Sequence, residues 1–390
     1  MGGPRSIVAQ ILSCLISLNF VACSGRYSQP SDKEYLPQKP GSNATSPTTP
    51  ASSQRIFRGS IGGKYPIQMT LMRGDGGALS GSYFYESKRS DLRLEGTIND
   101  KNEFVLSEYG GGNRTGIFKG RWRDTDYEPE AILEGDWSMP NGSQQSPFYL
   151  IGQHINPGSP LKLSAIEIRE ENKKHKFSVE ALYPQLEGAA DPGVEEFNQR
   201  ARNLVTNAVT NWKSDASVEP GGRDLTPDAA EDSFEINYIV RASTDAIISI
   251  EFDFDEYSHG AAHPSHSFQV LTLDLKTGRL LKLSDLFKAG TNYLSAISIH
   301  SIEQLRRWNK DSAKESGDNK PYLDDPEFLD GAKPTPKNYR IWTLTPNGLA
   351  ITFDYYQLGS YAAGAPAILI PYAKLKDLLD DNSPASSFWR

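Results

Sequence analysis

The sequence predicts a small all-β domain, a meander or barrel over residues 55–155, followed by an α+β domain over residues 161–382 with an antiparallel sheet and flanking helices. Three observations support this fold class. In the first region a short unit with a central glycine recurs between turn signals, without any helical stretch. In the second region, strand-like alternation gives way to helical spacing and returns. Between them, residues 156–160 read Asn-Pro-Gly-Ser-Pro, which marks a boundary.

Residues 1–22 are expected to be a signal peptide, because the apolar stretch up to Ala22 is short and interrupted by polar residues. The small residues before Cys23 resemble the lipobox of bacterial lipoproteins, in which this cysteine becomes an acylated, palmitate-bearing first residue. An ordinary signal peptide with an incidental cysteine is the alternative. The chain has two cysteines, and Cys14 would leave with the signal. Acylation of Cys23 would therefore leave no thiol for a disulfide or for catalysis.

Residues 23–54 are rich in Ser, Pro, Thr, Gln, Asn and Gly, which favours an unstructured tether. About 30 extended residues could reach on the order of 100 Å. Together with lipidation, this predicts a protein of the cell envelope, held to a membrane by its lipid anchor, and to the outer membrane if the source is Gram-negative. The net charge of −8 argues against nucleic-acid binding.

The all-β domain carries the recurring unit three times, with a looser fourth copy. The copies are Leu79-Ser-Gly-Ser-Tyr83, Leu94-Glu-Gly-Thr-Ile98, Leu133-Glu-Gly-Asp-Trp137 and, more loosely, Ile117 to Trp122. A glycine between large residues is typical of strands that bend sharply or close on themselves. Such a domain could be a ligand cup, but we favour a scaffold whose aromatic residues form its core.

In the α+β domain, alternating and helical patterns follow one another. Strands are expected at 161–168, 177–183, 234–240, 247–254, 268–274, 339–344, 349–353 and 368–370. Proline 184 is expected to end the second of these strands. Helices are expected after Asp191, after Thr291 and from Pro371. Lys276-Thr277-Gly278 predicts a hairpin turn, and residues 309–337 a long polar excursion.

The first candidate site is the loop that interrupts alternation at residues 257–264, which brings three histidines close in sequence. His259, His263 and His266 could together hold zinc with an open fourth position. Against zinc, the loop is rich in Pro and Gly and does not align ligands as a helix face would. We therefore expect no metal and no cofactor.

The second candidate is recognition by aromatic loops. The residues expected to bind a ligand are Tyr257, His259, His263, Tyr356 and Tyr361, from the histidine loop and from a second loop at residues 355–366. Tyrosines are well suited to anchor an interface, although each could instead pack the end of a sheet. No serine-nucleophile or phosphate-loop pattern is complete, so no catalytic residue is assigned.

Several motifs occur together in one order. They are Tyr183-Pro-Gln185, Tyr257 to Pro264, Asp274-Leu-Lys-Thr-Gly278, Leu283-Ser-Asp-Leu-Phe287, Tyr356 to Gly364 and Pro371-Tyr372. In this combination the chain resembles the RsiV-like extracellular domain, the lysozyme-binding ectodomain of a bacterial anti-sigma factor. Related domains occur on PdaC-type peptidoglycan deacetylases and on lipoproteins. We expect neither a deacetylase module nor anti-sigma activity here.

The resemblance implies a non-catalytic binding module for an envelope-associated ligand, either a lysozyme-like muramidase or peptidoglycan. Acidic neighbours of the two loops would favour a cationic protein. The alternative is a metal-dependent envelope hydrolase that uses His259, His263 and His266. A structural lipoprotein without a specific ligand is a third reading.

Overall fold

The computed structural model describes residues 54–390, except 89, 157–158, 174, 189–190, 218–230 and 317–329. The expected signal peptide, Cys23 and the tether up to residue 53 lie outside the described residues. Within the described part, no helix combines the length and apolar character needed to cross a membrane.

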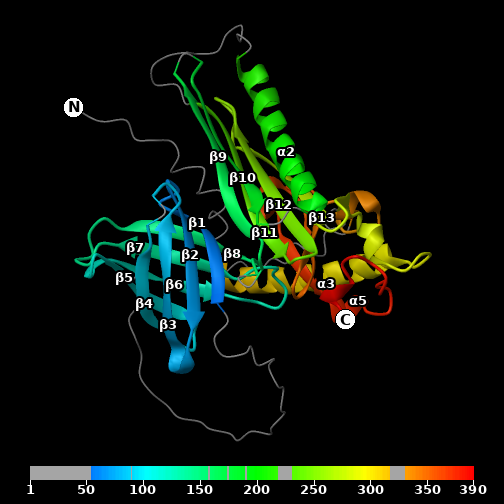
Figure 1. Cartoon of the computed structure of the whole chain (residues 1–390), viewed down its shortest axis with the longest axis horizontal. Coiled ribbons are helices and arrows are strands. Elements are labelled where there is room, and N and C mark those ends of the chain that lie inside the picture. Colours follow the sequence, from blue (N-terminus) through cyan, green and yellow to red (C-terminus); the bar gives the residue numbers. More distant parts are fainter. Residues whose placement is uncertain are drawn as a thin grey trace, which may run out of the picture.

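The first domain is a closed barrel of eight strands (Figure 1). The strands are β1 Gln54–Ile61, β2 Tyr65–Arg73, β3 Ala78–Tyr85, β4 Leu92–Ile98, β5 Glu103–Gly110, β6 Asn113–Arg123, β7 Ile132–Ser138 and β8 Ser146–Gln153, with a short 3-10 turn, η1, at Asp75–Gly77. Each strand pairs antiparallel with the next, and β1 pairs with both β2 and β8, which closes the barrel. The predicted all-β meander is thus a barrel.

Glycines of the recurring unit lie in the barrel wall where neighbouring backbones come closest. A Cβ atom at Gly81 would stand 1.9 Å from the carbonyl oxygen of Thr70, and one at Gly96 would stand 1.8 Å from that of Val105. Because the nearest atoms belong to the backbone of the neighbouring strand, any side chain at these positions would force the two strands apart. The recurring glycines therefore allow tight strand approach at inward-facing positions of a small barrel.

Aromatic side chains fill the barrel interior. The buried aromatic residues are Phe57, Tyr83, Phe104, Phe118, Trp122 and Phe148. Glu108, also buried, accepts hydrogen bonds from the Tyr83 hydroxyl and from Trp137 Nε1, both at 2.7 Å. Of the aromatic residues in the recurring units, Tyr83, Phe118 and Trp122 belong to the core, and Trp137 is partly buried against it.

The second region holds a six-stranded sheet of order β14-β13-β12-β11-β10-β9. Its strands are β9 Lys162–Asn172, β10 Phe177–Glu187, β11 Asp232–Ser243, β12 Ile247–Tyr257, β13 Ser265–Asp274 and β14 Arg279–Leu280. Strands β10 and β11 are parallel, whereas the other neighbours are antiparallel. The expectation of an antiparallel sheet was therefore wrong at this pair, because helix α2, Pro192–Ser217, forms the crossover that a parallel pair needs.

Strand β10 continues through Pro184, where the sequence predicts its end. Pro184 pairs with Ala165 of β9, while β11 pairs with β10 only as far as Ala181. Beyond Ala181 one edge of β10 has no ladder partner among the described strands. A proline can lie there because its missing N–H breaks no ladder hydrogen bond.

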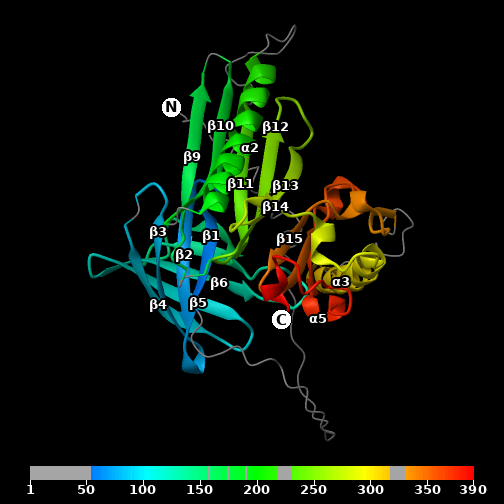
Figure 2. The ribbon, with the colours of Figure 1, turned by 45° about the vertical axis from the view of Figure 1, so that its right-hand side comes forward.

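Helix α2 covers one face of this sheet (Figure 2). Phe197, Ala201 and Val205 of α2 and Ile250 and Phe252 of β12 are fully buried members of the first core of this region. Side chains alternate along β12, so Glu251, Asp253 and Asp255 point to the opposite face. That polar face carries the candidate site.

A smaller sheet of order β15-β16-β17 completes the region. Its strands are β15 Trp342–Thr345, β16 Gly348–Thr352 and β17 Ala367–Pro371, and the helices are α3 Tyr293–Ser316 and a single turn, α5 Tyr372–Leu375. Short 3-10 segments are η2 Leu283–Leu286, η4 Pro336–Tyr339, η5 Tyr361–Ala363 and η6 Ser386–Phe388. This sheet packs with α3 and α5 around a second hydrophobic core. Helix α3 runs on to Ser316, into the segment that the sequence predicts as a polar excursion.

The barrel is joined to both sheets through a buried charge network. Arg241 of β11, only 2% exposed, pairs with Glu130 of the barrel and with Glu251 of β12, the latter at 2.7 Å. Glu251 also accepts a hydrogen bond of 2.7 Å from the Thr352 hydroxyl of the small sheet. Beside this network, Val240 N–H donates to the Gln153 side chain at 2.8 Å. The polar face is thus held in a fixed place between barrel and small sheet.

Candidate functional site: an aromatic and carboxylate cluster

The site is built where the polar face of the large sheet meets the loop after β16. On β12, Asp253 and Asp255 share one face because they are two residues apart. Asp255 lies directly opposite His266 of β13 in the strand register. The Nδ1 atom of His266 contacts the Asp255 carboxylate, and the side chain of His266 is only 2% exposed.

The loop at residues 354–366 covers these residues with aromatic rings. Tyr355 stacks on His266 with ring centres 4.4 Å apart, and Tyr361 stacks on His263 at 3.7 Å. The Tyr361 hydroxyl lies 2.8 Å from Nε2 of His266, and the Tyr356 hydroxyl lies 3.0 Å from Nε2 of His263. We call Tyr355, Tyr356, Tyr361, His263 and His266 the aromatic cluster.

Tyr356 has two properties that a packing residue rarely combines. Tyr356 is one of the exposed large hydrophobic residues, with 60% of its surface accessible, and its backbone has φ +62°. This left-handed conformation costs a non-glycine residue on the order of 1 kcal/mol or more. The fold thus holds a large ring toward solvent in a backbone conformation that is uncommon for a non-glycine residue.

Carboxyl groups accumulate beneath the aromatic cluster. Burial, with the charge of Asp255 next in importance, raises the pKa of Glu235 to about 7. Burial also raises the pKa of Asp253 well above its usual range, with further contributions from Asp255, Glu251 and Glu235. Burial raises the pKa of Asp354 as well, although its ion pair with Arg340 opposes the shift. These raised pKa values keep part of the carboxyls protonated near neutral pH, and an approaching cation would favour their ionised forms.

The three histidines of the sequence prediction do not form one ligand set in this structure. His263 Nδ1 lies 2.8 Å from the carbonyl oxygen of Pro264, and its Nε2 bonds Tyr356, so both ring nitrogens are engaged. The side chain of His259 is exposed. Among the described residues, the group of three metal-ligand side chains that lies close together is instead Asp253, Asp255 and His266.

Of the five residues expected to bind a ligand, the structure joins His263, Tyr356 and Tyr361. Tyr257 ends β12, and the backbone N–H of His259 donates to Asp232 Oδ1 at 2.7 Å. Within the described chain, these two take no part in the ring contacts of the aromatic cluster. Tyr257 and His259 thus lie at its edge.

The sequence-based list of binding residues omits the carboxylates. In the sequence, Asp253 and Asp255 look like the polar side of an ordinary amphipathic strand, because alternation alone does not show what packs on that side. The pairing of β12 with β13 is the feature that could have pointed to these carboxylates. That register places an acidic residue opposite His266.

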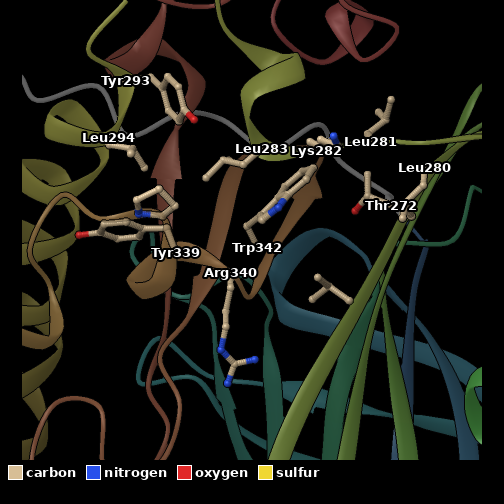
Figure 3. A pocket seen from close by; sticks show the side chains of 12 residues that line it. Thr272, Leu280, Leu281, Lys282, Leu283, Tyr293, Leu294, Tyr339, Arg340 and Trp342 are labelled. Carbon is tan, nitrogen blue, oxygen red and sulfur yellow. The ribbon is translucent and has the colours of Figure 1, made fainter.

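An apolar pocket of about 320 Å³ lies farther along the same face (Figure 3). Its lining includes Val270 and Thr272 of β13, together with Leu283, Tyr293 and Trp342. Figure 3 shows Leu283, Leu294 and Trp342 around the hollow, while the side chain of Arg340 extends away from them. Since Arg340 pairs with Asp354, the pocket adjoins the aromatic loop.

Comparison with known proteins gives one matching family, one curated relative and several solved structures. The family described as "Protein of unknown function (DUF3298)" matches residues 284–373. Over 129 residues the chain is 27% identical to the peptidoglycan-N-acetylmuramic acid deacetylase PdaC of Bacillus subtilis, strain 168. That alignment covers 33% of this chain and 26% of the relative. The chain thus matches about a quarter of the relative's length.

Two solved structures of the DUF3298 family are also similar. One, from Bacteroides fragilis, is 17% identical with a TM-score of 0.40 and covers 58% of this chain and 96% of its own. The other, from Pseudomonas aeruginosa PAO1, has the same identity and TM-score and covers 57% of this chain and 96% of its own.

Proposed function

We propose that this chain is a non-catalytic binding module of the cell envelope, and that its aromatic cluster binds a cationic protein of the lysozyme-like muramidase class. The observation that carries the proposal is Tyr356. This ring is exposed on a strained backbone, and its hydroxyl is held by His263 of the aromatic cluster. An exposed aromatic anchor in fixed orientation loses little entropy on binding, which favours affinity.

The charge of the site supports a cationic partner. Glu235 and Asp354 lie close enough to Asp253 to interact with it electrostatically. The nearby Arg340 is already paired with Asp354. The chain as a whole carries −8. Complementary charge speeds association and selects partners.

Peptidoglycan is the other candidate ligand, supported by the partial likeness to a deacetylase named for a peptidoglycan substrate. The two ligands differ in charge and size, so binding assays separate them. A lysozyme complex should weaken as salt is raised, because exposed charge pairs are screened. Binding to purified sacculi should depend less on salt, since stacking on tyrosines would dominate.

The localisation is part of the same proposal. A lipid on Cys23 followed by a tether of about 30 residues would hold the binding domains away from a membrane surface. A Cys23→Ala variant should lose labelling by a palmitate analogue and appear in the soluble fraction. Label retained on this variant would contradict the lipid anchor.

The binding experiment uses the purified chain and a lysozyme, measured by calorimetry. Tyr356→Ala and Tyr361→Ala should weaken binding at least about tenfold, the loss expected for an interface anchor. Tyr65 of the barrel, which is 51% exposed, provides the matched control, so Tyr65→Ala should bind normally. No complex with the unaltered chain would reject lysozyme, and sacculus binding lost in Tyr356→Ala would identify peptidoglycan instead.

The enzymatic alternative, a metal-dependent hydrolase built on His259, His263 and His266, has less support. Both ring nitrogens of His263 are occupied by Pro264 and Tyr356. Release of acetate or of a muropeptide from sacculi by the purified chain, lost in His263→Ala, would favour the enzyme over the binding module.

A further inference from the structure

A second feature of the same sheet face is a convergence of metal-ligand side chains beneath the aromatic cluster. Asp253, Asp255 and His266 each offer one ligand atom, and these atoms all lie within 4.8 Å of one another. Two rigid strands fix them, since Asp255 and His266 are register partners and Asp253 is two residues along β12. Ligands on neighbouring strands are held more precisely than ligands on a loop.

The Oδ1 atom of Asp253 lacks a partner. It is shut off from solvent and has no hydrogen-bond donor among the described residues. A buried carboxylate oxygen without a donor or cation is unfavourable by roughly 1–3 kcal/mol or more. This cost makes the oxygen a strong candidate to contact a cation.

The surrounding charges do not balance this carboxylate. Glu251 and Asp255 flank Asp253 on the same face of β12, and Glu235 of β11 is the register partner of Asp255. The arginines of the region are engaged elsewhere. Arg241 pairs with Glu130 and Glu251, and Arg340 pairs with Asp354.

We infer that Asp253, Asp255 and His266 form a binding site for a divalent transition-metal ion, with Zn²⁺ as its best representative. Two carboxylates and one imidazole suit Zn²⁺ or Mn²⁺ better than Ca²⁺, which prefers oxygen ligands alone. Three protein ligands leave at least one position for water or for a group of a bound partner.

The hydrogen bond from His266 to Tyr361 supplies the support that metal-bound histidines usually have. Without metal, Nδ1 of His266 contacts the Asp255 carboxylate, and Nε2 shares a hydrogen bond of 2.8 Å with the Tyr361 hydroxyl. With a cation on Nδ1, the ring proton would lie on Nε2, which would donate to the Tyr361 oxygen. The metal would thereby fix the position of Tyr361, which connects this site to the aromatic cluster.

The inference is tested by metal binding alone, with no protein ligand present. The chain, prepared without a histidine tag and stripped with EDTA, is titrated with Zn²⁺ in a calorimeter and analysed for bound metal. We expect one Zn²⁺ per folded chain, with a dissociation constant of about 1 μM or below. Failure of lysozyme binding would leave this result untouched, so the two proposals fail separately.

Variants locate the site. Asp253→Asn and His266→Gln should each reduce Zn²⁺ affinity at least tenfold, and Tyr361→Phe should reduce it about tenfold because it removes the supporting hydroxyl. The control His263→Ala should keep full stoichiometry, because His263 lies outside the three ligands. Circular dichroism confirms that each variant is folded. The metal-free Asp253→Asn variant should melt no lower than the unaltered chain, since it replaces a buried carboxyl whose Oδ1 has no hydrogen-bond donor among the described residues.

Two outcomes would overturn the inference. One is the absence of stoichiometric Zn²⁺ and Mn²⁺ binding to the folded chain. The other is loss of Zn²⁺ in His263→Ala with retention in a folded Asp253→Asn variant, which would assign the metal to the histidine loop instead.

Discussion

The hydroxyl of Tyr356 lies 3.0 Å from Nε2 of His263, and this contact joins two loops that are 93 positions apart in the chain. Because Nδ1–H of His263 donates to the carbonyl of Pro264, Nε2 is left to accept the tyrosine proton. The bond therefore fixes both the histidine tautomer and the direction of the exposed ring. Recognition by this surface should depend on that single hydroxyl.

Tyr356→Phe tests this dependence, since it removes the hydroxyl and keeps the ring. A neutral hydrogen bond contributes about 1 kcal/mol, so we expect lysozyme affinity to fall about fivefold with an unchanged melting temperature. Calorimetric titration measures the change, and Tyr65→Phe on the barrel is the control. Undiminished affinity in Tyr356→Phe would show that the ring needs no fixed orientation.

Arg241→Ala should be strongly destabilising. The change leaves Glu130 and Glu251 buried without their cation, and loss of one partner from a buried ion pair costs about 3–5 kcal/mol. Urea denaturation should show a lower midpoint. The control is Arg169→Ala, whose side chain is 62% exposed in its ion pairs and should change stability by less than about 1 kcal/mol. Equal midpoints for both variants would argue against the buried network.

Gly96→Ala should destabilise the barrel by about 1–3 kcal/mol, because the added Cβ would meet the Val105 carbonyl oxygen at 1.8 Å and force the two strands apart. Gly74→Ala provides the comparison. Its Cβ would lie 3.6 Å from that of Ala78, an ordinary contact, and should be nearly neutral. Thermal unfolding followed by tryptophan fluorescence measures both, and a neutral Gly96→Ala would contradict the close approach.

His154, between barrel and sheet, should make the protein acid-sensitive. Burial is the main cause that lowers its pKa below the usual 6.5, although the hydrogen bond to Pro129 opposes this shift. The unfolded chain therefore takes up a proton that the folded chain excludes. This contribution to stability is complete above pH 6.5 and decreases as the pH falls from there toward the lower folded value.

The measurement compares urea midpoints from pH 8 to pH 5 for the unaltered chain and for His154→Gln. The variant should lose less stability on acidification, by up to about 1.4 kcal/mol per pH unit. Identical slopes for the two proteins would show that His154 does not carry the acid sensitivity.

Much of the fold could be predicted because its signals are local. The glycine units between turns predict the barrel strands, and helical spacing up to Trp212 predicts α2. The parallel pairing of β10 with β11 and the passage of β10 through Pro184 were missed. Both depend on which strand lies beside β10, and alternation within a strand carries no information about its neighbours.

The candidate site could be predicted only in part, because some of its contacts depend on how distant strands and loops pair. The aromatic loops stand out in sequence, and His263, Tyr356 and Tyr361 meet as tertiary contacts. The zinc alternative grouped His259, His263 and His266 by spacing, whereas the sheet register groups His266 with Asp255. Spacing along a loop does not determine where side chains point once the chain turns at Pro264.

The pairing of Arg241 with Glu130 has a consequence for engineering the chain. Cutting the chain at the boundary near residues 156–160 would leave Glu130 in one fragment without its cation. In the other fragment, Arg241 would keep only one of its two carboxylate partners, Glu251. A graft of either half onto a foreign protein would inherit that imbalance. Constructing a free-standing recognition unit would therefore require neutralising both partners together, for example with Glu130→Gln in one half and Arg241→Met in the other.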